Sequence, residues 1–252
     1  MTSSIRSLKQ FLKSRLSRRA NSGQEASSLE VVHADNDLRV TSAGDPAAPG
    51  LFICFTGIRQ AMGGIGAEEF VGSTAMPGYS ALFVSDLKRS WYNGFEPERL
   101  AAILRPRAEG KRVVTIGNSM GGFGAIWATT LLDVDVAIAF APQFSVHPEI
   151  VPGEERWKEF TSRIEHFRHP SLEKAFAGNA RIYTINGDDD EEHWSQFPQG
   201  SNRQHVVIAG SGHDPALSVK KSGALSDLLA TCIRGGDALD VLELAGLPVR
   251  TV

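Results

Sequence analysis

The residues of this chain that could do chemistry begin with a serine set between glycines. Residues 117–121 read Gly-Asn-Ser-Met-Gly, which fits the G-x-S-x-G pattern. The β-branched run at 113–116 favours a buried strand before it, and the apolar stretch at 123–132 favours a buried helix after it. In a sharp strand-to-helix turn the hydroxyl of Ser119 stands clear of the backbone, and side chains on the flanking glycines would collide. The pattern therefore predicts a nucleophilic serine.

A serine hydroxyl needs a base, and the base needs a carboxylate that orients it. His213 ends a Gly-Ser-Gly-His turn after an apolar run, so it can reach over the serine. The acids at 188–192 follow another apolar run and supply the carboxylate. His193 comes directly after these acids and competes as the base. It would come from the acid's own loop, so we favour His213.

The surrounding elements alternate between short apolar strands and helices. Strands are expected at 51–55, 81–84, 113–116, 136–140, 182–185 and 205–209, after a hairpin at 29–32 and 38–41. Helices are expected at 97–107, 123–132, 154–167, 216–233 and 238–245. This alternation predicts an α/β fold with a mostly parallel sheet covered on both faces. Because right-handed crossovers bring the strand ends to one edge, Gly57, Ser119, Asp190 and His213 should share that edge.

With these residues in place, the chain resembles an α/β-hydrolase from about residue 30 to residue 231. The likeness rests on 117–122, on Gly187-Asp188-Asp189-Asp190 and on Gly212-His213. The order Ser, Asp, His is the order used by that fold. In the family the acid commonly stands three positions after the glycine that closes its strand, which implies Asp190. The run of acids leaves Asp188 and Asp189 open.

The resemblance also implies an oxyanion hole made of backbone amides. One donor is the N–H after the serine, which here belongs to Met120. The second comes from the loop after the third strand, which often reads His-Gly and here reads Thr56-Gly57-Ile58. This departure leaves the second donor open between Gly57 and Ile58. It does not remove the hole, because backbone amides provide the stabilisation.

Composition divides the chain into two parts. The first 23 residues carry six basic residues and no acid, and their apolar residues fall near helical spacing. Residues 1–28 are thus expected to be a basic arm. We favour a solvated arm over a helix packed on the body or a second subunit, and both over a helix at a membrane surface. Residues 29–252 are expected to be an α/β-hydrolase domain with a small lid-like insertion at about 143–179.

Net charge, cysteine content and missing motifs exclude several classes of protein. A net charge of −3 shows no footprint for nucleic acid, and no apolar run approaches the ~20 residues needed to span a membrane. Cys54 and Cys232 lie in predicted elements as buried thiols, so a cytoplasmic location is expected. We expect no cofactor, because Walker A and G-x-G-x-x-G patterns are missing. No metal is expected, because nothing completes a site around His166 and His169.

Together these observations predict a serine hydrolase that cleaves a small carboxylic ester or thioester through an acyl-enzyme. Two alternatives remain: an acyltransferase with an alcohol or sugar acceptor, and a non-catalytic binding protein on the same fold. The stretch Asp86–Asn93 resembles hydrolase-like proteins of bacterial surface-polysaccharide assembly, which implies an acceptor of that kind for the transferase. We expect Trp91 and Tyr92 in this stretch to pack rather than to bind substrate. The sequence predicts no oligomeric state.

Overall fold

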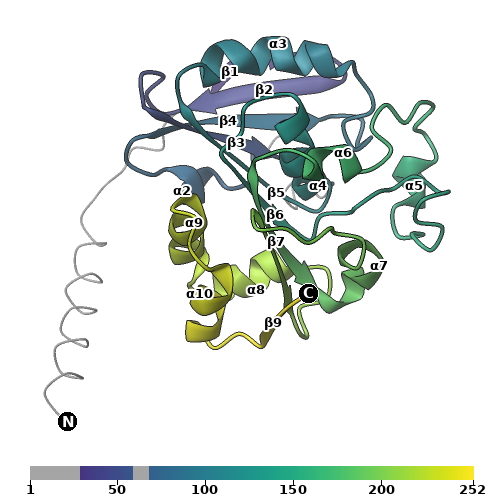
Figure 1. Ribbon diagram of the computed structural model, residues 1–252. Coiled ribbons are helices and arrows are strands. Elements are labelled where there is room, and N and C mark those ends of the chain that lie inside the picture. Colours follow the sequence, from purple (N-terminus) through teal and green to yellow (C-terminus); the bar gives the residue numbers. More distant parts are fainter. Residues whose placement is uncertain (1–28, 59–67) are drawn as a thin grey trace, which may run out of the picture.

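The computed structural model describes residues 29–58 and 68–252, so the expected basic arm lies outside the described residues. The described residues form one nine-stranded sheet in the order β1-β2-β4-β3-β5-β6-β7-β8-β9 (Figure 1). The strands are β1 (Glu30–Ala34), β2 (Leu38–Ala43), β3 (Gly50–Phe55), β4 (Tyr79–Asp86), β5 (Arg112–Asn118), β6 (Val136–Phe140), β7 (Arg181–Gly187), β8 (Arg203–Ile208) and β9 (Val249–Thr251).

The sheet is parallel through its centre and antiparallel at both sides. Strands β4, β3, β5, β6, β7 and β8 pair in parallel. The β1–β2 hairpin joins β4 in antiparallel register, and β9 joins β8 in the same way. The C-terminal ends of the parallel strands therefore meet at one edge, as the sequence predicted.

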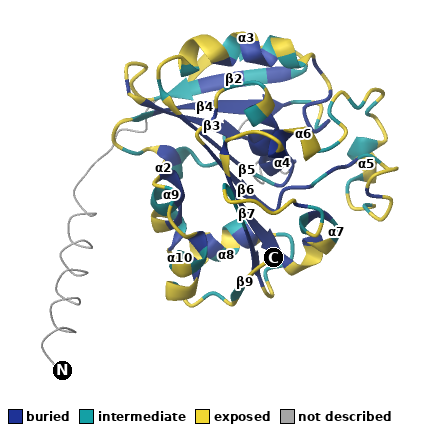
Figure 2. Ribbon diagram, viewed as in Figure 1, coloured by how far each residue is buried: buried dark blue, intermediate teal, exposed yellow. Residues whose placement is uncertain are grey.

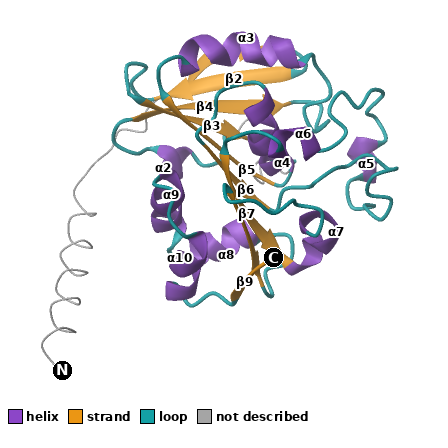
Figure 3. Ribbon diagram, viewed as in Figure 1, coloured by secondary structure: helices purple, strands orange, loops and turns teal. Residues whose placement is uncertain are grey.

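Helices cover both faces of this sheet (Figures 1 and 3). They are α2 (Val71–Thr74), α3 (Pro97–Ala108), α4 (Met120–Trp127), α5 (Lys158–Thr161), α6 (Glu173–Phe176), α7 (Glu191–Trp194), α8 (Pro215–Ser222), α9 (Leu225–Ile233) and α10 (Ala238–Leu244). One apolar cluster holds side chains of α3, α4 and α6, and the other holds those of α8, α9 and α10. The predicted α/β architecture is confirmed.

Alternation along β3 explains how one strand serves two cores. Ile53 and Phe55 join the cluster under α3 and α4, whereas Phe52 and Cys54 join the cluster under α8 and α9. Every residue of β3 is buried, which is why the strand is apolar throughout (Figure 2). Cys54 and Cys232 are buried free thiols, as expected from their positions.

Some expected elements were wrong in extent. The helix expected at 216–233 is two helices, because Gly223 adopts a left-handed φ of 80° and ends α8. Of the helix expected at 154–167, only α5 forms, which is four residues long. Trp157 and Phe167 pack on the core from backbone outside this helix. Strand β9 was missed, since three residues carry too little pattern. Among the described residues, no helix is both long and apolar enough to cross a membrane.

Candidate active site

The nucleophile turn lies between β5 and α4, at the middle of the sheet. Ser119 has φ 55° and ψ −120°, a conformation that a non-glycine residue adopts only when its surroundings enforce it. A Cβ on Gly117 would lie 2.0 Å from the carbonyl oxygen of Gly121, and one on Gly121 would lie 2.1 Å from that of Phe55. Only glycine fits at these two positions, so the G-x-S-x-G spacing follows from steric exclusion.

Three predicted side chains meet at this turn. The Nε2 atom of His213 lies 2.9 Å from the hydroxyl oxygen of Ser119. Its Nδ1 atom lies 2.7 Å from Oδ1 of Asp190, which follows β7. Asp190 is buried, whereas a fifth of the His213 side chain remains accessible (21%). The serine, the imidazole and the carboxylate therefore form one continuous hydrogen-bonded chain.

The acids left open by the sequence have three different surroundings. Asp190 contacts the imidazole of His213. Asp188 accepts hydrogen bonds from the amides of Gly210 and Gly212, at 2.8 and 2.9 Å, and these bonds lower its pKa. A Cβ on Gly212 would lie 3.0 Å from Oδ2 of Asp189, so that carboxylate lies against the turn rather than the imidazole. Of the three acids, Asp190 alone is linked to Ser119 through hydrogen bonds with His213.

His193, the competing base, contacts Glu154 rather than Ser119. It is buried, and its Nε2 atom lies 2.9 Å from Oε2 of Glu154. Burial raises the pKa of Glu154, but hydrogen bonds from His193 and Arg156 outweigh it and lower that pKa to about 2. Glu154 is thus held as a carboxylate in the segment between β6 and β7.

Arg156 connects that segment to Asp190. Its Nη1 atom donates to Oδ1 of Asp190 at 2.9 Å, and its guanidinium also pairs with Glu154. Glu192 lies 3.6 Å from the same guanidinium. Glu154, Glu192 and His193 bring ligand atoms within 4.8 Å of one another, a spacing that metal ions accept, but the guanidinium already pairs with both carboxylates. We therefore assign no metal to this cluster.

A pocket of about 360 Å³ opens beside the serine. It is lined by Gly57, Ile58, Glu69, Asn118, Ser119, Arg156, Trp157, His213 and Asp214. The indole of Trp157 packs on the imidazole of His213, with ring centroids 5.3 Å apart. Trp157 and Arg156 lie in the predicted lid-like segment, which therefore contributes part of the pocket lining.

The expected oxyanion donors flank this pocket. Met120 is the first residue of α4, so its amide has no carbonyl partner within the helix. Gly57 and Ile58 both line the pocket. A carboxylate competes for this position: burial raises the pKa of Glu69 to about 7, while a hydrogen bond from the Gly57 amide lowers it. The choice between Gly57 and Ile58 as the second donor stays a prediction.

Sequence reasoning missed three residues of this site: Glu69, Arg156 and Gln143. Gln143 donates to the hydroxyl oxygen of Ser119 at 3.1 Å. No local pattern marks any of them, since each reaches the site through loops whose course depends on tertiary packing. Sequence offers one signal for two of them: Gln143 and Glu69 come after β6 and β3, whose C-terminal ends lie at the predicted edge.

Several solved structures share the fold of this chain. A capsule O-acetyltransferase of Neisseria meningitidis serogroup A matches with a TM-score of 0.57 at 15% identity, over 86% of this chain and 99% of that one. Est1E from Butyrivibrio proteoclasticus matches with a TM-score of 0.56 at 16% identity, over 82% of this chain and 100% of that one. The Pyrococcus horikoshii acylaminoacyl peptidase matches with a TM-score of 0.57 at 15% identity, over 90% of this chain and 45% of that one.

The chain therefore has the α/β-hydrolase fold, as its resemblance implied. No protein-family model matches the sequence, and a search of curated proteins finds no match. At these identities the likeness establishes the architecture, and the chemistry has to be argued from the side chains.

Proposed function

We propose that this protein is a serine hydrolase that cleaves a carboxylic ester or thioester through an acyl-enzyme. The observation that carries the proposal is the hydrogen-bonded chain from Ser119 through His213 to Asp190, with distances of 2.9 and 2.7 Å. A nucleophile, a base and an orienting carboxylate in this geometry are the groups that acyl transfer needs.

The steps follow from the atoms in contact. Ser119 attacks the acyl carbonyl while Nε2 of His213 takes its proton, and Asp190 stabilises the imidazolium. The amides of Met120 and of Gly57 or Ile58 donate to the oxyanion. The tetrahedral intermediate collapses, and His213 gives the proton to the leaving alcohol or thiol. Water then attacks the acyl-serine with His213 again as the base.

Acyl transfer to an alcohol is the second candidate. It uses the same groups, with an acceptor hydroxyl in place of water. Trp157 supports it, because its indole lines the pocket beside His213, where an aromatic ring offers a flat apolar surface to a sugar ring. The fold relatives include a capsule O-acetyltransferase, so a polysaccharide hydroxyl is the acceptor class to test.

Hydrolysis of p-nitrophenyl acetate by the full chain tests the proposal. Ser119→Ala should lower kcat by about 10⁴-fold or more, because the nucleophile is removed. Ser218→Ala, at a half-buried position of α8, should retain the wild-type rate. A Ser119→Ala variant of full activity would refute the assignment. If a fluorophosphonate probe and every acyl substrate failed to react with the wild type, a binding protein would be favoured instead.

Product analysis separates the two reactions. With sugar alcohols present, a hydrolase releases acetate at an unchanged rate, whereas a transferase forms the sugar ester at the expense of acetate. Mass spectrometry of the products distinguishes them directly.

A further inference from the structure

A buried side-chain amide contacts the nucleophile in addition to the histidine. Gln143 lies three residues beyond β6 and is fully buried (0% exposed). Its Nε2 atom donates to the hydroxyl oxygen of Ser119 at 3.1 Å, and its Oε1 atom accepts from the indole N–H of Trp91 at 3.0 Å. Neither bond takes part in the reaction steps given above.

The indole decides which way this amide faces. The Nε1–H group of Trp91 can only donate, so the atom of Gln143 that meets it must be the carbonyl oxygen. The NH₂ group of Gln143 therefore faces Ser119. Because the hydroxyl oxygen of Ser119 accepts from Gln143, its own hydrogen is left to donate to Nε2 of His213. That is the orientation from which the base removes the proton.

The loop that carries Trp91 is held in a strained shape. Arg89, Trp91 and Tyr92 all have positive φ angles, of 55°, 51° and 61°. The buried carboxylate of Asp86 holds the loop by accepting from the amides of Lys88, Ser90 and Tyr92 and from the hydroxyl of Ser90. Strain of this kind persists only where the surroundings enforce it, and it clusters at functional sites.

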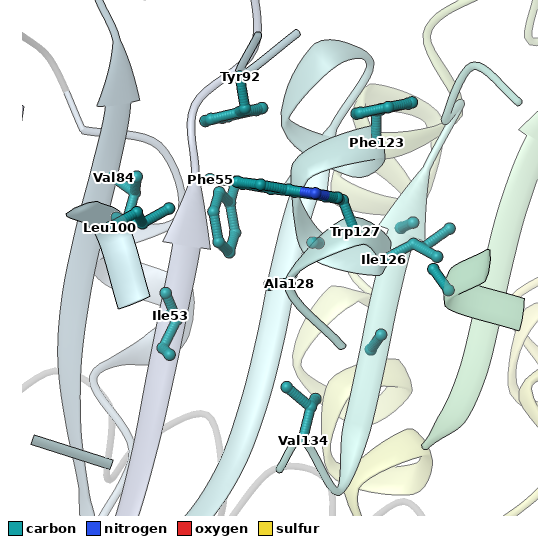
Figure 4. Packing of buried hydrophobic residues seen from close by; sticks show 14 of the residues in the cluster. Ile53, Phe55, Val84, Tyr92, Leu100, Phe123, Ile126, Trp127, Ala128 and Val134 are labelled. Carbon is teal, nitrogen blue, oxygen red and sulfur yellow. The ribbon is translucent and has the colours of Figure 1, made fainter. Parts of the chain in front are cut away.

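Tyr92 anchors the same loop in the core. Its ring meets Phe55 edge-on at 5.3 Å and stacks on Trp127 at 5.7 Å (Figure 4). Its hydroxyl donates to the carbonyl oxygen of Thr56 at 3.1 Å, next to the predicted oxyanion loop. These contacts fix the loop against the core. The indole of Trp91 is thereby held in place to donate to Gln143.

The backbone that carries Gln143 is also fitted to the nucleophile turn. The carbonyl of Phe140 accepts from the amide of Ser119 at 2.8 Å, and Ala141 has a φ of 43°. A Cβ on Gly122 would lie 2.9 Å from the carbonyl oxygen of Phe140, so helix α4 packs directly on this segment. Gln143 therefore reaches Ser119 from backbone that is fixed to the turn itself.

We propose that Gln143 is a further catalytic residue and that Trp91 is the positioning residue that orients it. The inference rests on Ser119 being the proposed nucleophile. In acylation the proton of Ser119 passes to His213, the oxygen forms the bond to the acyl carbon, and Gln143 stabilises the negative charge that develops on it. In deacylation the bond from that oxygen to carbon breaks, and Gln143 stabilises the departing oxygen until His213 returns the proton.

Four variants assayed with p-nitrophenyl acetate test this proposal. Gln143→Leu should lower kcat about 10- to 100-fold with KM changed less than about twofold, because the hydrogen bond strengthens only as charge develops. Trp91→Phe, which removes the N–H and keeps an aromatic ring, should lower kcat about 5- to 10-fold. The double variant should be no slower than Gln143→Leu, since Trp91 acts through Gln143. Gln199→Leu, an exposed glutamine bonded to the chain end, should retain the wild-type rate.

Gln143→Glu separates catalysis from packing, because it keeps the volume and can still accept from Trp91. It places a carboxylate beside the serine oxygen that His213 deprotonates. The acid limb of the kcat/KM profile should therefore move to higher pH, by about 0.5 to 1 unit, since the charge favours the imidazolium. A purely structural glutamine would lower activity without moving that limb.

Three results would overturn the proposal. They are a wild-type kcat in Gln143→Leu, a Trp91→Phe effect that persists undiminished in the double variant, and an unmoved acid limb in Gln143→Glu. Fluorophosphonate labelling keeps this test apart from the proposed function. An unlabelled wild type would contradict the nucleophile itself, whereas a labelled wild type with a fully active Gln143→Leu contradicts only the role of Gln143.

Discussion

The two ends of the Ser119–His213–Asp190 chain are built in different ways. At the serine end, the turn excludes a side chain through its own backbone, because a Cβ on Gly117 would lie 2.0 Å from the carbonyl oxygen of Gly121, four residues further along. At the acid end, Asp190 depends on partners 23 and 34 residues away, His213 and Arg156. The serine end is a tight turn shaped by steric exclusion, whereas the acid end is an assembly of distant loops.

Because of this difference, substitutions at the two ends should have different effects on stability and activity. A side chain added to a glycine of the tight turn clashes with backbone and destabilises the fold. An assembly of distant loops can lose one contact and keep its shape. Substitutions at the acid end should therefore reduce activity more than stability. Those at the glycines of the serine end should reduce stability first.

Asp190→Asn should give the largest effect among the substitutions that spare the nucleophile. The amide can no longer hold the tautomer of His213 that accepts the serine proton, so kcat should fall about 10⁴-fold with little change in unfolding temperature. The comparison variant is Asp188→Asn, whose single carbonyl oxygen can accept from the amide of Gly210 or of Gly212 but not from both, and its kcat should fall less than about tenfold because Asp188 does not contact His213. Equal losses in the two variants would contradict the assignment of the acid. Both are measured by ester hydrolysis at saturating substrate.

Gly117→Ala should instead act on the fold. Its Cβ would lie 2.0 Å from the carbonyl oxygen of Gly121, which is a backbone atom and cannot move aside as a flexible side chain could. We expect a loss of about 3 kcal/mol or more in the free energy of unfolding, measured by urea denaturation. Gly72→Ala in α2 meets nothing within 4 Å and should change stability by less than about 0.5 kcal/mol. A stable Gly117→Ala protein would remove the contrast between the two ends.

Arg156→Met should lower kcat about tenfold, because Asp190 loses the guanidinium that holds it at 2.9 Å but keeps His213. Arg156→Lys should recover part of the loss, which a packing role would not explain. Arg163→Met is the matched control, since Arg163 and Glu159 form an exposed pair in the same segment. It should leave kcat unchanged in steady-state kinetics.

Glu69→Gln should change the pH profile with a small effect on the maximum rate. Burial raises the pKa of Glu69 from 4.5 to about 7, so the group becomes charged above that pH and then repels an oxyanion beside Gly57. Wild-type kcat/KM should therefore fall a few-fold as the pH rises through about 7, and Glu69→Gln should not show this decline. The same shift makes wild-type stability fall, relative to the variant, as the pH rises from 4.5 to about 7. Parallel profiles for both proteins would exclude this role.

The sequence predicts the local serine turn better than it predicts the contacts made by distant loops. The strands around Ser119 were predicted because their apolar runs are continuous, and the turn because glycine is forced there. His213 and Asp190 were predicted from the order of strand-end loops, but the run of three acids needed coordinates to separate them. Arg156 and Gln143 could not be predicted, because their approach depends on how irregular backbone between β6 and β7 packs against the sheet.

The most direct test of this account is a peptide-level mass measurement after reaction with a fluorophosphonate. We predict one adduct, on the peptide that contains Ser119, and its loss in both Ser119→Ala and, over the same reaction time, a His213→Ala protein that still folds. An unreacted wild type, or an adduct on another serine, would contradict the claim that residues from distant loops activate this hydroxyl.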